Sequence, residues 1–188
     1  DSKQSRGLGD VYKRQTNEVQ AKGTTVHEAL EKLFDLPQDE RSLDNLHNLF
    51  RKVWTDVRNN DEHVHLFDNQ DQERDWGIDG LKLLSNYFTL EDPTNFEPLE
   101  RERWVRGAIN DLNLRGILDR MDRNEKGGLI IVDYKSGKAP IAKYKEPRFF
   151  ALKLYALLIK DEIGETPAEL KLIYLSLIHI SEPTRLLA

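Results

Sequence analysis

Two apolar stretches of the chain end in charged side chains whose types and spacing suit metal chemistry. The stretch LIIVDYK ends in Asp133, Tyr134 and Lys135, and the earlier stretch GILD ends in Asp119. Side chains alternate along a strand, so Asp133 and Lys135 are expected on one face and Tyr134 on the other. A turn at residues 124–128 would pair the two strands and bring Asp119 close to Asp133.

The expected pair of carboxylates needs a positive partner. Two such charges about 4 Å apart repel by roughly 4 kcal/mol at an effective dielectric of 20. A hard divalent cation offsets this repulsion better than one lysine, so Asp119, Asp133 and the backbone carbonyl of Tyr134 are expected to ligate Mg²⁺ or Mn²⁺. Water on such an ion becomes a nucleophile that can attack a phosphoryl group, with Lys135 orienting it. The alternative is that Asp133 and Lys135 form an ordinary surface ion pair.

The elements that must position these residues follow from the apolar periodicity. Val26, Leu30, Leu33 and Phe34 recur at helical intervals, and Thr25 with Glu28 has the spacing of a capping box. The pattern predicts helices over 22–36, 41–58, 76–88 and 147–158, and strands over 99–109, 112–119, 129–135 and 170–174. This order predicts a mixed α/β fold in which a hairpin leads into a crossover.

Two of these segments carry charged residues of particular interest. The capping box would place His27 in the first turn of its helix, where a histidine is more often a packing or hydrogen-bonding residue than a catalytic one. The dense charge of residues 99–109 is typical of an exposed edge strand.

Both ends of the chain look foreign to its middle. Ser5–Gln15 can be encoded by a DNA string whose reverse complement translates as Leu175–Arg185. Such an inverted repeat resembles a sequencing-library adaptor of the transposon type. Residues 1–15 and 175–188 are therefore predicted to be artefacts outside the fold, and residues 16–174 to form one domain that is cut at both ends.

Composition limits the classes of function. With 188 residues and 38% hydrophobic content, the chain suits a single globular domain. Its formal net charge of −5 gives no global attraction for nucleic acid, so any DNA contact needs a local basic strip. The absence of cysteine excludes disulfides and thiolate metal sites within this chain. No apolar run predicts a membrane span or a signal peptide, which favours a cytoplasmic protein without a membrane partner.

Taken together, the motifs resemble those of the PD-(D/E)xK nuclease superfamily, in particular stand-alone RecB-type exonucleases. Three motifs occur in the family's order, and their residues are Gly23 and His27 for G-x-x-x-H, Gly116, Asp119, Arg120 and Asp122 for G-x-x-D-R-x-D, and Asp133, Tyr134, Lys135, Gly137 and Lys138 for D-Y-K-[TS]-G-K. Tyr155 and Ala156 fit the helix that follows. Each motif is weak alone, but their joint order is specific.

The resemblance implies a restriction-endonuclease-like mixed sheet flanked by helices, with an N-terminal helical portion. It implies a metal-dependent DNA exonuclease of repair or recombination that hydrolyses phosphodiester bonds at single-stranded ends, with a helicase as a further partner. Asp119, Asp133 and His27 would hold Mg²⁺ or Mn²⁺, and Lys135 would be the catalytic lysine. Arg120 and Asp122 are interpreted as structural, pairing with each other or with Glu125.

Other positions concern DNA binding and departures from the family. Tyr155, Lys138 and Lys143 are expected to contact DNA. Ala151 stands where the family has a glutamine, and alanine cannot hydrogen-bond a nucleotide or a water. An iron–sulfur cluster, which related members carry, is expected only in a longer form of the protein.

Two alternatives to a nuclease remain open at this point. The first is a catalytically weak or inactive nuclease-like module that binds DNA or a partner without cutting. The second is a truncated reading frame that makes no stable protein.

Overall fold

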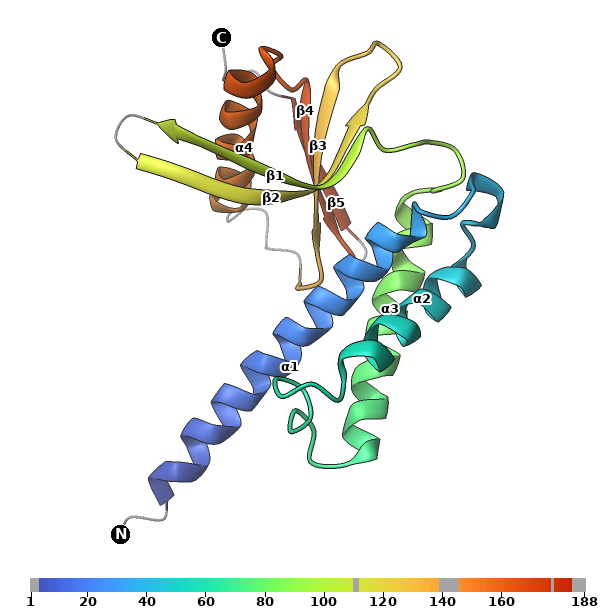
Figure 1. Cartoon of the computed structure of the whole chain (residues 1–188), viewed down its shortest axis with the longest axis vertical. Helices are drawn as coiled ribbons and strands as arrows, with labels where there is room; N and C mark the ends of the chain where they lie inside the picture. Colours follow the sequence, from blue (N-terminus) through green and yellow to red (C-terminus); the bar gives the residue numbers. More distant parts are fainter. Residues whose placement is uncertain (1–3, 110–111, 139–145, 177, 184–188) are drawn as a thin grey trace.

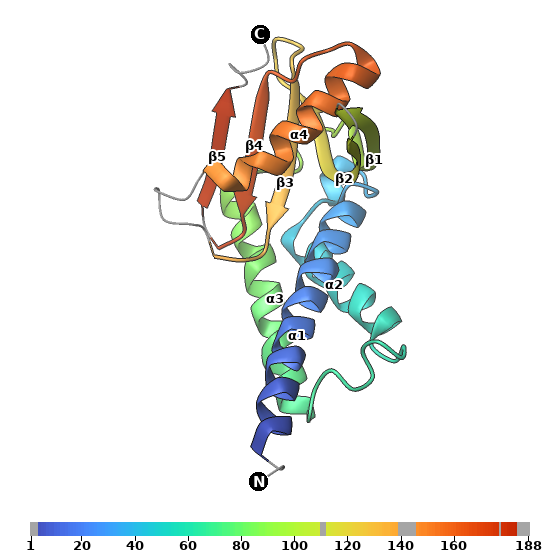
Figure 2. The same ribbon diagram turned by 90° about the vertical axis from the view of Figure 1, so that its left-hand side faces the viewer.

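The computed structural model describes residues 4–109, 112–138, 146–176 and 178–183, with side chains for 18–108, 113–138 and 149–176. The helices α1 (Gln4–Leu33), α2 (Leu43–Val57) and α3 (Gln70–Leu90) form a bundle that packs against one face of a sheet. The helix α4 (Glu146–Ile163) covers the other face (Figures 1 and 2). A short 3₁₀ helix, Gln38–Glu40, joins α1 to α2.

The sheet has five strands in sequence order, and its topology is mixed. The strands are β1 (Glu100–Ile109), β2 (Leu112–Arg123), β3 (Leu129–Lys135), β4 (Glu169–Tyr174) and β5 (Ile178–Pro183). Neighbouring strands are antiparallel except β3 and β4, which are parallel and are connected through α4. The predicted α/β fold is confirmed, with its hairpin, its crossover and its charged edge strand β1.

The central strand β3 is apolar because both of its faces are buried. Val132 and Tyr134 belong to the core shared with α1, α2 and α3, whereas Leu129 and Ile131 belong to the core under α4. This alternation explains why the sequence of β3 reads as a continuous apolar run rather than an alternating one.

The predicted start of the first helix is wrong. The helix α1 begins at Gln4, so Thr25 is an interior residue, and its hydroxyl donates to the carbonyl of Ala21 at 2.8 Å instead of capping a helix end. A threonine inside a helix commonly satisfies its hydroxyl in this way. His27 therefore lies well inside α1 and not in its first turn.

The second difference concerns β2, whose predicted end is Asp119 and which continues to Arg123. Only Arg120–Arg123 pair with β3, whereas the earlier part of β2 pairs with β1 alone. The sheet therefore forks just before Arg120, and Asp119 lies at the fork (Figure 1).

Parts of the two terminal segments lie within described elements, since α1 includes residues 4–15 and β5 pairs with β4. Their proposed origin in an adaptor stays a prediction. Among the described residues, no helix has both the length and the apolar character needed to cross a bilayer.

Candidate active site

A cleft of about 680 Å³ opens at the fork of the sheet, beside α1. Its walls carry His27 and Glu31 from α1, Glu102 from β1, Asp119 from β2 and Lys135 from β3. Residues from distant parts of the sequence thus meet at one place, and most of them are ionisable.

Asp119 connects three elements at the base of this cleft. Its Oδ2 accepts a hydrogen bond from the backbone N–H of Tyr134 at 2.7 Å and lies 3.4 Å from Nδ1 of His27. Burial acts to lower the pKa of His27, but the hydrogen bond to Asp119 and the charges of Asp119 and Asp133 outweigh it and raise that pKa. The structure therefore places His27 beside Asp119, and that the two residues share a metal ion stays a prediction.

Glu102 is the site residue that the sequence reasoning missed. One ligand atom each from His27, Glu102 and Asp119 lies within 4.8 Å of the other two. Glu102 has a φ of 43°, the one positive φ outside glycine among the described residues. A residue in this region costs on the order of 1–3 kcal/mol, and such strain is typical of functional sites.

The strain at Glu102 interrupts the ladder between β1 and β2. Arg101 and Arg103 remain paired with β2, but Glu102, which would face Asp119, is not paired. The sequence did contain a signal for this arrangement. Counting back through the hairpin from the turn that the sequence predicts at residues 110–111 places Glu102 opposite Asp119, although the dense charge of the segment hid the pattern.

The carboxylates at the fork carry more negative charge than the neighbouring cations balance. Burial, followed by the charges of Asp119 and Glu31, raises the pKa of Glu102 to about 7. Burial and the charge of Asp119 raise the pKa of Asp133 to about 6, even though Lys135 opposes the shift. A divalent cation would relieve this repulsion, and a set of carboxylate oxygens with one imidazole fits Mg²⁺ or Mn²⁺.

Asp133 and Lys135 form an ion pair at the end of β3, the contact that the sequence offered as the alternative to a metal site. Nζ of Lys135 lies 2.5 Å from Oδ2 of Asp133, and the lysine side chain is partly exposed where it lines the cleft. Asp133 is not part of the compact group made by His27, Glu102 and Asp119. Its role as a ligand, like that of the Tyr134 carbonyl, stays a prediction.

The predicted DNA-binding residues have different outcomes. Lys138 is exposed and lines the cleft. Tyr155 lies against Gly116, where an added Cβ would be only 2.4 Å from its ring, and both burial and the charge of Asp133 raise its pKa. Lys143 lies outside the described residues. Ala151 is exposed on α4, one turn before Tyr155.

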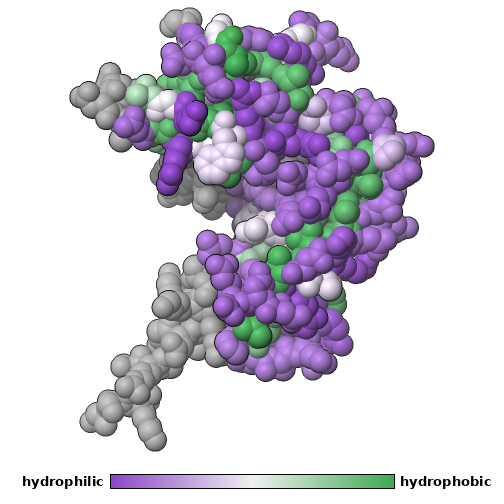
Figure 3. Space-filling view, in the orientation of Figure 1, coloured by the Kyte–Doolittle hydropathy of each residue, from purple (hydrophilic) through white to green (hydrophobic). Residues whose placement is uncertain are grey.

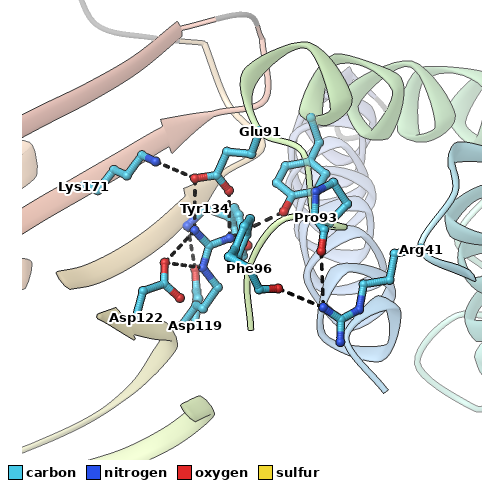
Figure 4. Close-up of polar contacts among 10 residues, drawn as sticks. Arg41, Glu91, Pro93, Phe96, Asp119, Asp122, Tyr134 and Lys171 are labelled. Carbon is cyan, nitrogen blue, oxygen red and sulfur yellow. Dashed lines mark hydrogen bonds and ion pairs between the residues drawn. The ribbon is translucent and has the colours of Figure 1, made fainter. Parts of the chain in front are cut away.

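Arg120, the neighbour of Asp119, belongs to a separate buried cluster. Its guanidinium donates to Glu91 Oε2 at 2.8 Å and to Asp122 Oδ2 at 3.0 Å, and Lys171 Nζ lies 2.5 Å from Glu91 Oε1 (Figure 4 labels the three partners). It also contacts the hydroxyl of Tyr134. The predicted pairing of Arg120 with Asp122 is confirmed, and Glu91 from the end of α3 is the partner that the sequence did not indicate.

Comparison with known proteins gives two findings. A model of the PD-(D/E)XK nuclease superfamily matches residues 4–185. A protein of Streptococcus mutans serotype c, named as one of the subunits of an ATP-dependent helicase/deoxyribonuclease, is 28% identical to the chain over 120 residues. The alignment covers 62% of this chain but only 11% of that relative.

Proposed function

Because the chain belongs to the PD-(D/E)XK nuclease superfamily, we propose that it is a metal-dependent DNA exonuclease that hydrolyses phosphodiester bonds at single-stranded or frayed ends. The name of the Streptococcus relative, which refers to a helicase and deoxyribonuclease, supports DNA as the substrate and a helicase as a partner. The resemblance of the motifs to those of RecB-type exonucleases favours a role in DNA repair or recombination.

The observation that carries this proposal is the group of His27, Glu102 and Asp119 within 4.8 Å at the base of an open cleft. These residues would hold Mg²⁺ or Mn²⁺, and Asp133 adds negative charge beside them. A divalent cation bound there supplies an acidified water and neutralises charge on a phosphoryl oxygen.

The remaining steps belong to side chains of the chain itself. The hydrogen bond from the Tyr134 N–H fixes the carboxylate of Asp119 in one orientation. The ion pair with Asp133 holds the ammonium group of Lys135 at the cleft. From there, Lys135 donates hydrogen bonds to the attacking water or to a phosphoryl oxygen, where negative charge develops in the transition state.

The first prediction removes that lysine. We expect Lys135→Ala to lower the rate of metal-dependent cleavage of end-labelled single-stranded DNA by about 10²–10³-fold, the usual effect of losing one donor to developing charge. The control is Lys126→Ala, which removes an exposed lysine from the turn between β2 and β3 and should cleave like the wild type. Equal cleavage by wild type and Lys135→Ala would rule out the mechanism.

Ala151 motivates the second candidate function, a nuclease-like module that binds DNA without cutting. Its exposed methyl group offers no hydrogen bond to a nucleotide where the family has a glutamine. The same assay separates the two functions, since a binding module retains labelled DNA but forms no metal-dependent products.

A further inference from the structure

The hairpin of β1 and β2 has one covered face and one open face. Val105 is buried under α4, Gly107 lies against Leu158 of α4, and Arg103 donates to Glu162 of α4 at 2.7 Å. By the alternation of a strand, the intervening residues Trp104 and Arg106 point away from α4. Figure 1 shows α4 behind the hairpin, and Figure 3 shows strongly hydrophilic atoms beside pale and hydrophobic ones where the hairpin faces the viewer.

Trp104 dominates this open face. Its side chain is 67% exposed, whereas the other tryptophans of the chain, Trp54 and Trp76, are 8% and 5% exposed. Its cross-strand partner is Ile117, which is also exposed and lines the cleft next to Asp119. An exposed aromatic ring is therefore continuous with the wall of the candidate active site.

Two arginines follow Trp104 on the same face. Arg106 and Arg115 are direct cross-strand partners and both are exposed. Like charges in this position destabilise a sheet. Within the described part of the chain, neither arginine forms an ion pair or a hydrogen bond. Both line a hollow of about 580 Å³, which makes a local basic spot on a chain of net charge −5.

The acidic, aromatic and basic side chains of β1 follow one another along the strand, starting at the cleft. Trp104 and Arg106 lie on the same face of β1, about 7 Å apart at roughly 3.3 Å per residue, and Glu102 precedes them at the cleft. A carboxylate of the candidate metal site, an exposed aromatic ring and an arginine thus follow one another along β1. Proteins that bind single-stranded DNA combine aromatic stacking with positive charge along the backbone in this way.

We propose that the open face of β1 and β2 binds the single strand that enters the cleft, with one base stacked on Trp104 and the adjoining phosphates held by Arg106 and Arg115. This inference rests on the proposed nuclease function and names its substrate as an unpaired strand. A base inside a duplex could not stack on the ring, so double-stranded DNA is expected to bind more weakly.

The test measures binding of the full chain to a fluorescent thymidine oligonucleotide in EDTA, where no metal-dependent cleavage occurs. We expect Trp104→Ala to weaken binding by roughly 5- to 150-fold, the range for loss of one stacked base. Each phosphate contact with a single strand contributes about 0.7 to the slope of log affinity against log salt concentration. The double variant Arg106→Gln and Arg115→Gln removes two such contacts and should therefore reduce the slope by about 1.4. Arg123→Gln, at the far end of β2, should leave both quantities unchanged.

A second readout separates this inference from the nuclease proposal. Cleavage of bis-p-nitrophenyl phosphate, a diester without neighbouring nucleotides, should be normal in Trp104→Ala and lost in Lys135→Ala. Unchanged affinity and salt slope in the hairpin variants would overturn the binding face, whatever the activity. Equal affinity for duplex and single strand would also overturn it. If the hairpin variants bind the oligonucleotide more weakly but the wild type cleaves neither substrate, the binding face is supported and the nuclease proposal is overturned.

Discussion

Asp119 and Arg120 are neighbours on β2, yet they belong to two charged clusters with opposite properties. The Arg120 cluster, made of Arg120, Lys171, Glu91 and Asp122, is buried and contains equal numbers of cations and anions. The Asp119 cluster, made of His27, Glu102, Asp119, Asp133 and Lys135, opens to the cleft and has more carboxylates than permanent cations.

Charge balance separates a structural cluster from a ligand site in this molecule. In the Arg120 cluster every charge has an opposite partner, and the guanidinium also lies 4.8 Å from the centre of the Phe96 ring. Such a cluster fastens the end of α3 to the sheet. In the Asp119 cluster burial, followed by the charge of Asp119, raises the pKa values of Glu102 and Asp133, and Lys135 is the one permanent cation among the five residues. A bound cation would supply the missing charge.

The largest expected effect comes from breaking the balanced cluster. We expect Arg120→Met to lower the free energy of unfolding by about 3–5 kcal/mol, because the buried carboxylate of Asp122 would lose its cationic partner and Glu91 would keep only Lys171. The control is Arg123→Met on the same strand. Its ion pair with Glu165 is exposed to solvent, so its loss should change the free energy of unfolding far less. Urea denaturation in EDTA measures both values, and equal losses would contradict the distinction between the clusters.

Replacing one glutamate by glutamine should change the free energy of unfolding by a smaller amount, and the sign of the change should differ between the two clusters. At pH 8 in EDTA, Glu91→Gln removes hydrogen bonds to Arg120 and Lys171 and should lower the free energy of unfolding by about 1.5–3 kcal/mol. Glu102→Gln removes a repelling charge and should raise it by about 1 kcal/mol, a value reduced for solvent screening. Thermal melting of the two variants should therefore shift in opposite directions. Shifts of the same sign would contradict the assigned difference in charge balance.

The same Glu91 variant also tests how the free energy of unfolding depends on pH. Burial alone would raise the pKa of Glu91, but its hydrogen bonds and ion pairs with Arg120 and Lys171 lower it below the ordinary value of 4.5. The stability that this carboxylate contributes is therefore present above pH 4.5 and is lost as the pH falls through its lower pKa in the folded protein. Glu91→Gln should show a shallower loss of stability in acid than the wild type.

The sequence predicted the elements whose pattern is local. The apolar run of residues 129–135 and the motifs around Asp119 and Lys135 indicated the central strand, the crossover and the place of the site. The start of α1 was not predictable in the same way, because a threonine with a later glutamate suits a capping box and a helix interior alike. Deciding between them required the packing of α1 on α2 and α3.

The missed partners are those that come from distant elements. Glu91 reaches Arg120 from the end of α3, and Lys171 reaches Glu91 from β4. No spacing in the sequence links these residues. Glu102 was hidden for a different reason. Its charged neighbours suggested an edge strand in solvent, whereas a local change of backbone direction directs this one side chain into the cleft.

The most direct test of the central claim is a calorimetric titration of the full chain with Mn²⁺ alone. Asp119→Asn and Asp122→Asn make the same change on one strand, the first in the unbalanced cluster and the second in the balanced one. We predict that Asp122→Asn binds Mn²⁺ as tightly as the wild type and that Asp119→Asn binds it about 10- to 100-fold more weakly, at least the loss seen for supporting residues of a metal site. Wild-type affinity in Asp119→Asn would contradict the assignment of the Asp119 cluster as the metal centre.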